Sequence, residues 1–288
     1  MINMADVDLK TNSPGRYTSK NKLNDLTGKE WIQLTKSFWM QNGLGASHPH
    51  AKIEQQHPAP FGFKDISKMI TFFTKNGDIV LDPFSGVGST AKACALTGRK
   101  SVGIELSKKW AELSTKRLID EVGSCDGQKI IIGDSRVSLK QFNDSFFDFI
   151  ITSPPYWQIL TKKTDLKSKE RVEKGLDKKY SEDEKDLGNI DDYPLFLEEL
   201  KKVFSECYRV LKNKKYTVVV VSDFRHKSRF IPYHLDVITL MNDIGFKLEG
   251  ITILVQNHKG LKPYGYPYAF VSNIHHQYFL IFRKETHV

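Results

Sequence analysis

The sequence predicts an α/β fold with a mostly parallel, seven-stranded sheet that ends in an antiparallel hairpin. Short apolar runs alternate with stretches whose apolar residues recur at helical spacing. Four successive runs end in polar residues, as strands do at the ligand-binding edge of open α/β sheets. The last two runs are joined by a loop. The expected strands are 78–81, 99–106, 129–134, 146–152, 216–222, 246–255 and 277–283, and the expected helices include 91–96, 193–211 and 232–244.

Length and composition bound the domain organisation. The chain has 288 residues, 40% of them hydrophobic, which is enough to bury one large core. We expect a main domain over 57–288 and, over 1–56, an N-terminal arm followed by a short helix at 30–41. The segment 158–192 carries many charges of both signs and little apolar periodicity, so it is expected to be a solvated insertion.

Several classes of protein are disfavoured by the sequence. It contains no long apolar run and no signal peptide, so we expect an intracellular, cytoplasmic protein without a membrane partner. Cys94, Cys125 and Cys207 lie far apart and have no histidine at ligand spacing. Neither a metal site nor a disulfide framework is therefore expected.

A glycine-rich turn follows the first strand of the main domain. Residues 82–90 read Asp-Pro-Phe-Ser-Gly-Val-Gly-Ser-Thr and lead into a helix. Gly86 and Gly88 allow a tight turn and a close approach of the backbone to a ligand, and the helix N-terminus favours a negatively charged group. Turns of this kind are common in α/β folds, so this one predicts a ligand site without naming the ligand.

The next two strands each end in a carboxylate. Glu105 lies 23 residues after Asp82, where nucleotide-binding sheets carry the acid that binds the ribose hydroxyls. Asp134 ends the following strand. Because the carboxyl ends of parallel strands meet at one edge, we expect both acids beside the glycine turn.

The tetrapeptide Ser153-Pro154-Pro155-Tyr156 is a more specific signal. Two consecutive prolines fix two φ angles, remove two N–H donors and hold Ser153 extended. The Ser153 hydroxyl and the Pro154 carbonyl then form a stiff row of acceptors, suited to both hydrogens of an exocyclic base amine. Tyr156 would offer a stacking face to an extruded base. The alternative is a proline-rich turn whose tyrosine packs over the core.

Together these segments resemble the amino-methyltransferases of DNA, which make N4-methylcytosine or N6-methyladenine from S-adenosylmethionine (AdoMet). The resemblance covers roughly residues 57 to 284 and implies a Rossmann-like methyltransferase fold with AdoMet as cofactor. It implies a catalytic role for Ser153, Pro154, Pro155 and Tyr156. The cofactor-binding residues that it implies are Phe61, Asp82, Phe84, Gly86, Gly88, Ser89, Thr90, Glu105, Leu106, Asp134 and Ser135.

The serine form of the tetrapeptide, followed by Trp157, resembles the cytosine-N4 enzymes, so we expect direct methyl transfer to cytosine N4. The motif order, with Asp82 before Ser153, is better known among adenine-N6 enzymes. Ring-carbon methylation is disfavoured because the chain has no Pro-Cys nucleophile motif. An adenine-N6 DNA methyltransferase, an RNA base methyltransferase and a non-enzymatic AdoMet-binding subunit associated with DNA stay open as alternatives.

Basic and aromatic residues after the fifth strand favour DNA as the partner. The net charge of +9 suits a polyanion. The loop 256–276 interleaves lysines with tyrosines, a composition suited to stacking on bases. The substrate-binding residues that we expect are Trp157, Arg225, Lys227, Arg229, Lys262, Tyr264 and Tyr266. A homodimer and a cognate restriction endonuclease stay open as further partners.

Overall fold

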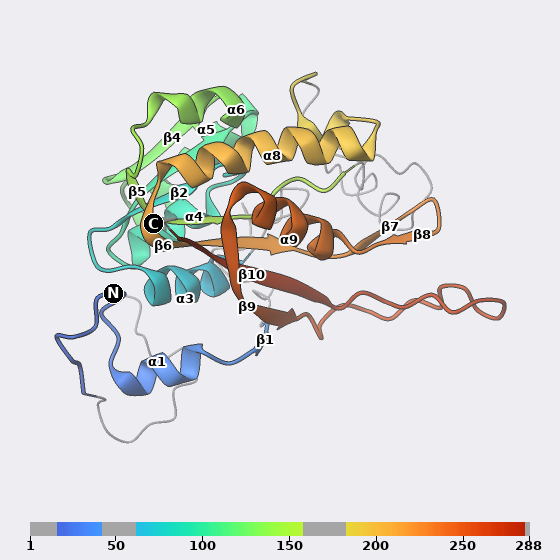
Figure 1. The fold of residues 1–288 in the computed structure, drawn as a ribbon, viewed down its shortest axis with the longest axis horizontal. Coiled ribbons are helices and arrows are strands. Elements are labelled where there is room, and N and C mark those ends of the chain that lie inside the picture. The colour runs from blue at the N-terminus through green and yellow to red at the C-terminus, as the bar shows by residue number, and fades with distance from the viewer. Residues whose placement is uncertain (1–15, 42–61, 158–182, 286–288) are drawn as a thin grey trace.

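A central sheet covered by helices on both faces organises the protein (Figure 1). The computed structural model describes residues 16–41, 62–157 and 183–285. The sheet has eight strands in the order β1-β9-β10-β6-β5-β2-β3-β4. The predicted α/β fold, mostly parallel with a C-terminal antiparallel hairpin, is confirmed, and the sheet has one strand more than the seven expected.

The first half of the sheet is parallel throughout. Strands β5, β2, β3 and β4 are neighbours in that order and run in the same direction. The elements of this half are β2 (Ile79–Asp82), α4 (Ser89–Leu96), β3 (Lys100–Glu105), α5 (Lys108–Val122), β4 (Gln128–Ile132), α6 (Ser135–Ser138), η2 (Leu139–Gln141) and β5 (Phe147–Thr152).

The second half adds a parallel strand and then the antiparallel hairpin. Strand β6 runs parallel to β5, and β10 pairs antiparallel with both β6 and β9. A separate two-stranded hairpin, β7–β8, follows β6. The elements are η3 (Leu187–Asn189), α8 (Tyr193–Val210), β6 (Leu211–Val221), β7 (Phe224–His226), β8 (Arg229–Ile231), α9 (Tyr233–Ile244), β9 (Phe246–Val255) and β10 (His276–Lys284).

The N-terminal region differs from the prediction. A single helix over 30–41 was expected, but α1 (Gly28–Leu34) ends earlier and Phe38–Met40 forms strand β1, parallel to β9. The open edge of β9 explains the strand, because its backbone groups pair with the segment: Ile253 N donates to the Ser37 carbonyl at 2.8 Å.

The described part of the expected arm also packs on the domain. Leu26 is buried, and Asn24 Nδ2 donates to the Phe72 carbonyl in α3 (Phe63–Phe73) at 2.5 Å. Residues 16–27 are therefore held by the main domain, which the polar composition of this segment did not indicate.

Two hydrophobic layers hold the sheet between its helices. One lies between the sheet and α8 and α9, and the other between the sheet and α3 and α4. All six residues of β5 are buried, as expected of a strand covered on both faces. This packing brings the carboxyl ends of β2, β3, β4 and β5 to one edge. No helix in the described ranges is long and apolar enough to cross a membrane.

Candidate active site

The glycine turn between β2 and α4 is held in a conformation that requires glycine. Gly88, the N-cap of α4, has φ 71°. A Cβ atom there would lie 1.9 Å from Ser114 Oγ in α5, so only glycine lets the turn and α5 approach this closely. The residues just before it, Pro83 to Val87, line a cavity at the edge of the sheet.

Asp82 lies beneath this turn, and each of its carboxylate oxygens accepts a hydrogen bond from a threonine. Thr152 Oγ1 donates to Oδ1 at 2.7 Å, and Thr90 Oγ1 donates to Oδ2 at 2.6 Å. Burial raises the pKa of Asp82, an effect that these hydroxyls and the Phe84 N–H partly offset. Asp82 thus joins the ends of β2 and β5 to α4, and it does not line the cavity.

Glu105 projects into the cavity from the end of β3. Its Oε2 accepts from Gly86 N and its Oε1 from Ser107 N, each at 2.8 Å. Burial raises the pKa of Glu105 to about 7, against the lowering effect of the two N–H groups. The carboxyl is therefore oriented by the backbone on both sides and is close to its titration point at neutral pH.

Asp134 is hydrogen-bonded to Arg136, which was not among the predicted site residues. Arg136 donates to it through Nε at 3.0 Å and Nη2 at 2.7 Å. Burial raises the pKa of Asp134, but the Arg136 hydrogen bonds outweigh it and hold the pKa below its usual value. Arg136 also binds Glu199 of α8 at 2.6 Å and the Lys185 carbonyl at 2.8 Å. One side chain therefore connects Asp134 with α8 and with the segment before η3.

The tetrapeptide follows β5 directly and lines the same cavity. The Pro155 carbonyl accepts a hydrogen bond from Tyr233 Oη at 3.3 Å, which helps to fix its position. Tyr156 is buried, and its ring meets Phe224 edge-on with centroids 6.3 Å apart. The tyrosine thus packs against the core and also lines the cavity, while Ser153 stays partly accessible.

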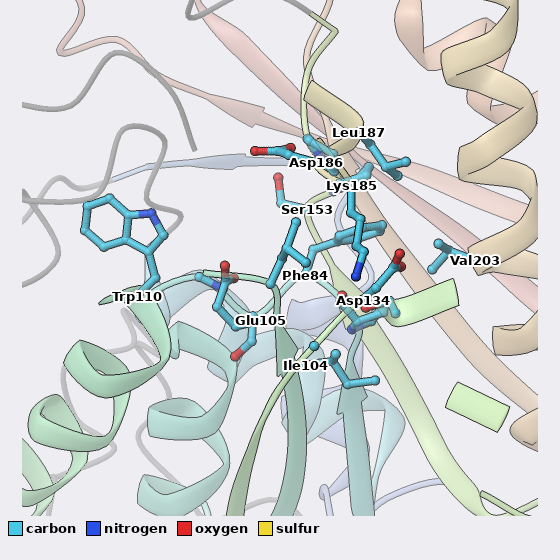
Figure 2. Close-up of a pocket in the computed structure, with 18 of the residues that line it drawn as sticks. Phe84, Ile104, Glu105, Trp110, Asp134, Ser153, Lys185, Asp186, Leu187 and Val203 are labelled. Atoms are coloured by element: carbon cyan, nitrogen blue, oxygen red, sulfur yellow. Dashed lines mark hydrogen bonds between the residues drawn. The ribbon is translucent and has the colours of Figure 1, made fainter. Parts of the chain in front are cut away.

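The ends of four neighbouring strands come together around one cavity (Figure 2). Its empty volume, including open solvent at the mouth, is about 930 Å³. The predicted residues that line it are Phe84, Gly86, Ser89, Glu105, Leu106, Asp134, Ser135, Ser153, Pro154, Pro155 and Tyr156.

The cavity also contains residues that the sequence reasoning missed. Trp110 in α5 and Val203 in α8 supply apolar walls. Lys185, Asp186 and Leu187 complete the lining from the end of the charged segment 158–192. Leu187 is an apolar residue near the end of this charged segment, and it could have indicated that this end of the segment is buried.

Some predicted residues lie outside the lining. Gly88 and Thr90 support the turn from below, and Trp157 is buried with its Nε1 donating to the Ile190 carbonyl at 2.8 Å. Phe61 lies outside the described residues. Among the residues that are described, no group of three or more His, Cys, Asp or Glu is placed to hold a metal ion.

The expected DNA-binding residues lie on two projections at one end of the molecule (Figure 1). Arg225, Lys227 and Arg229 belong to the β7–β8 hairpin. Lys262, Tyr264 and Tyr266 belong to the loop 256–275 between β9 and β10, called the arm below. The exposed side-chain fractions in the arm reach 81% for Tyr266, 93% for Tyr268 and 91% for Phe270. Arg225 Nη2 links hairpin and arm through Ser272 Oγ at 3.4 Å.

A family model described as DNA methylase, of the N6 and N4 type, matches residues 8–116 and 147–288. These ranges cover well over half of the chain. The chain belongs to this DNA methylase family. The prediction of a DNA amino-methyltransferase is thereby confirmed at the level of the family, which includes both N4 and N6 enzymes.

Individual relatives match the chain over shorter stretches. The orphan methyltransferase M.BamHII of Bacillus amyloliquefaciens is 46% identical over 67 residues, which are 23% of this chain and 25% of that protein. The type II methyltransferase M.MjaI of Methanocaldococcus jannaschii is 33% identical over 139 residues, 48% of this chain and 39% of that protein. The chain thus aligns with about a quarter to two-fifths of the length of these relatives.

Among solved structures, TTHA0409 of Thermus thermophilus, complexed with S-adenosyl-L-methionine, is similar to this chain. Its sequence identity is 28% and its TM-score 0.37, and the alignment covers 54% of this chain and 55% of that one.

AdoMet is the cofactor of this methylase family, and the cavity has the chemistry to hold it. Glu105 offers carboxylate oxygens to ribose hydroxyls, and Phe84, Trp110 and Val203 offer apolar walls to an adenine ring. Ser85 also lines the cavity, and its Oγ is buried without a hydrogen-bond partner among the described residues.

Proposed function

We propose that this DNA methylase transfers the methyl group of AdoMet to the exocyclic N4 amine of cytosine in DNA, at specific sites. One observation carries the proposal: Ser153 and both prolines of the tetrapeptide line the same cavity as Glu105 and the glycine turn. A base amine placed at Ser153 would then lie beside the cofactor, so that the two reactants are held together.

The chain's own residues would position the amine. Ser153 Oγ and the Pro154 carbonyl accept its two hydrogens and aim the nitrogen lone pair into the cavity. When bound, AdoMet supplies a methyl group on a positively charged sulfur, which needs no further activation. The proline pair and the Tyr233 hydrogen bond to Pro155 keep the acceptors rigid, so little reorganisation accompanies the transfer.

Binding of DNA is assigned to the hairpin and the arm. Lys227 and Arg229 are exposed on the hairpin and offer cations to phosphates. The arm presents exposed aromatic rings next to Lys262, which suits stacking on bases or filling the space that an extruded base leaves. Trp157 would act indirectly, because its ring lies 4.3 Å from that of His226 in the hairpin and thus supports it.

An adenine-N6 methyltransferase is the second candidate, favoured by the order of Asp82 before Ser153 in the chain. Incubation of mixed-sequence duplex DNA with labelled AdoMet, followed by nucleoside mass spectrometry, separates the two. N4-methylcytosine supports the proposal, and N6-methyladenine replaces it with the second candidate. Parallel reactions with single-stranded DNA and RNA test the RNA alternative. AdoMet binding without turnover on any of them would indicate the non-enzymatic subunit.

A homodimer is proposed because the described residues include no second module that could clamp DNA. A cognate restriction endonuclease is proposed as a further partner. Sedimentation of the protein with and without duplex DNA tests whether it forms a homodimer. Protection of methylated duplex DNA against a restriction endonuclease from the same organism tests the second partner.

A further inference from the structure

Three glutamine side chains form a hydrogen-bonded row at adjoining ends of β1, β9 and β10. Gln256 follows β9, Gln277 lies in β10, and Gln41 follows β1. Gln256 Nε2 donates to Gln41 Oε1 at 2.8 Å and to Gln277 Oε1 at 3.2 Å. The row crosses three segments that lie far apart in the sequence, since 215 positions separate Gln41 from Gln256.

A carboxylate fixes the direction of every amide in this row. Asp65 Oδ2 accepts from Gln41 Nε2 at 3.4 Å, and Asp65 Oδ1 accepts from Lys68 Nζ at 3.2 Å. Since a carboxylate accepts hydrogen bonds, Gln41 must turn its NH2 to Asp65 and its oxygen to Gln256. Gln256 must then present its NH2 to Gln41.

Gln277 is oriented as the last member of the row. Its carbonyl oxygen accepts from Gln256 Nε2, so its NH2 group is directed away from the row. Gln256 itself is 7% exposed, and its backbone N–H donates to the His275 carbonyl at 2.7 Å. The amide that orients Gln277 is therefore fixed at both its side chain and its backbone.

Gln277 lies at the strand end next to the tetrapeptide. It precedes Tyr278, which pairs with Val221 at the end of β6, and β6 is the neighbour of β5, whose last residue Thr152 is followed directly by the tetrapeptide. Gln277 and Ser153 both act to lower the pKa of Tyr156, although burial, the larger effect, raises that pKa to about 12. Tyr156 Oη is buried without a hydrogen-bond partner among the described residues.

We propose that Gln277 is a specificity-determining residue that donates a hydrogen bond to the ring nitrogen next to the exocyclic amine of the target base. This inference rests on the proposed function of the same site. Cytosine and adenine both present this pattern, an amine donor beside a ring-nitrogen acceptor. Guanine and thymine carry a hydrogen on the corresponding ring nitrogen, so they would place a donor against the Gln277 NH2 and be rejected.

The row gives Gln256 and Gln41 a role as positioning residues. Neither needs to touch the base, because each acts by holding the next amide in one of its two possible orientations. Gln256→Glu replaces the NH2 donor with a carboxylate. Gln277 would then turn its NH2 towards that carboxylate and present its oxygen, the wrong group, to the base.

The test combines a protein change with a change in the base. The target base is placed in the duplex position that product analysis identifies, either in its natural form or as the deaza analogue whose ring nitrogen is replaced by C–H. We expect wild-type protein to lose roughly tenfold to a hundredfold in kcat/KM on the analogue, the range for one buried hydrogen bond. Gln277→Leu should lose a similar factor on the natural base.

The decisive result is the combination of the two changes. If Gln277 contacts the ring nitrogen, Gln277→Leu should lose little more on the analogue, because the hydrogen bond is already gone. Losses that multiply would overturn the proposal, and so would wild-type protein that methylates the analogue at full rate. The comparison of wild-type protein on the natural base and on the analogue uses no variant. The proposal therefore stays testable even if Gln277→Leu fails to fold.

Two controls separate this inference from the proposed function and from damage to the fold. Gln128→Leu removes a similarly half-buried glutamine in β4, whose Nε2 donates to the Arg99 carbonyl at 2.9 Å, and should leave the analogue effect unchanged. AdoMet affinity should stay within twofold in Gln277→Leu and Gln256→Glu. Wild-type protein that methylates no DNA base at all contradicts the proposed function. Methylation with multiplying losses contradicts only the role of Gln277.

Discussion

The cavity at the edge of the sheet and the two projections, the hairpin and the arm, are built in different ways. Around the cavity, polar groups are tied to the backbone over short distances: Gly86 N and Ser107 N orient Glu105, and Asp82 joins two strands to a helix. The arm instead exposes its aromatic side chains almost completely, as in Tyr268 at 93%. The cavity is therefore preorganised for a small ligand, whereas the arm has apolar surface left to bury against a large one.

The largest expected effect lies where the two regions meet, at Ser153. We expect Ser153→Ala to lower kcat by about a hundredfold to a thousandfold, the cost of losing one preorganised hydrogen-bonding group. AdoMet affinity should change less than twofold in calorimetric titration. Ser205→Ala in α8, whose hydroxyl only donates to the Lys201 carbonyl, serves as the control. Equal loss of rate and affinity would assign Ser153 to the cofactor instead.

The rigidity of the cavity side depends on a buried charge cluster under the turn. Glu121 Oε2 binds Lys92 Nζ and, at 3.1 Å, Arg117 Nε, and both cations are fully buried. Glu121→Leu should lower the free energy of unfolding by about 3–5 kcal/mol in urea titrations, because two buried charges lose their counterion. The matched change Glu112→Leu on the same helix removes an exposed pair with Lys108 and should cost less than about 1 kcal/mol. Similar losses in both variants would contradict this account.

The arm is expected to affect DNA binding alone. Tyr266→Ala combined with Tyr268→Ala should weaken DNA binding roughly tenfold or more, since stacking contributes about 1–3 kcal/mol per base. Thermal stability and AdoMet affinity should not change, because both rings are largely exposed. Tyr17→Ala, an exposed tyrosine outside the arm, is the control in fluorescence anisotropy. Unchanged DNA affinity would separate the arm from DNA recognition.

AdoMet affinity should depend on pH through Glu105. Its pKa is raised from 4.5 to about 7 by burial, so the folded protein binds this proton more tightly than the unfolded chain does. That contribution to stability is complete below pH 4.5 and is lost as pH rises through about 7. Ribose hydroxyls donate to the ionised carboxylate, so AdoMet affinity should instead rise about tenfold from pH 6 to pH 8. Glu105→Gln should bind weakly at both pH values, and a pH dependence that survives in it would exclude Glu105 as the titrating group.

The smallest expected effects concern single charges on the hairpin. Lys227→Gln and Arg229→Gln should each reduce the slope of log affinity against log salt by about 1, equally for all DNA sequences. Lys129→Gln, an exposed lysine in β4 at the opposite edge of the sheet, should leave the slope unchanged. A change of sequence preference in either hairpin variant would indicate base contacts instead of phosphate contacts.

Much of the cavity was predictable because its residues are encoded by local backbone requirements. Gly86, Gly88 and the proline pair each specify a turn, and the apolar runs before them specify the strands that carry Glu105 and Ser153 to one edge. The partners of these residues were not predictable. Asp82 accepts from Thr90 and Thr152, and no local pattern shows that β2 and β5 are neighbours.

The sequence by itself determined the α/β class, the succession of most strands along the chain and many of the residues that line the cavity, because turns and strands depend on residues close together in the chain. Only the tertiary structure decided that β1 closes the edge of β9, that Lys185 to Leu187 complete the cavity, and that Gln41 helps to orient Gln277. These features arise where an exposed strand edge or an unsatisfied amide meets a distant segment. Such pairings are set by the packing of the whole chain and leave no periodic signal in the sequence.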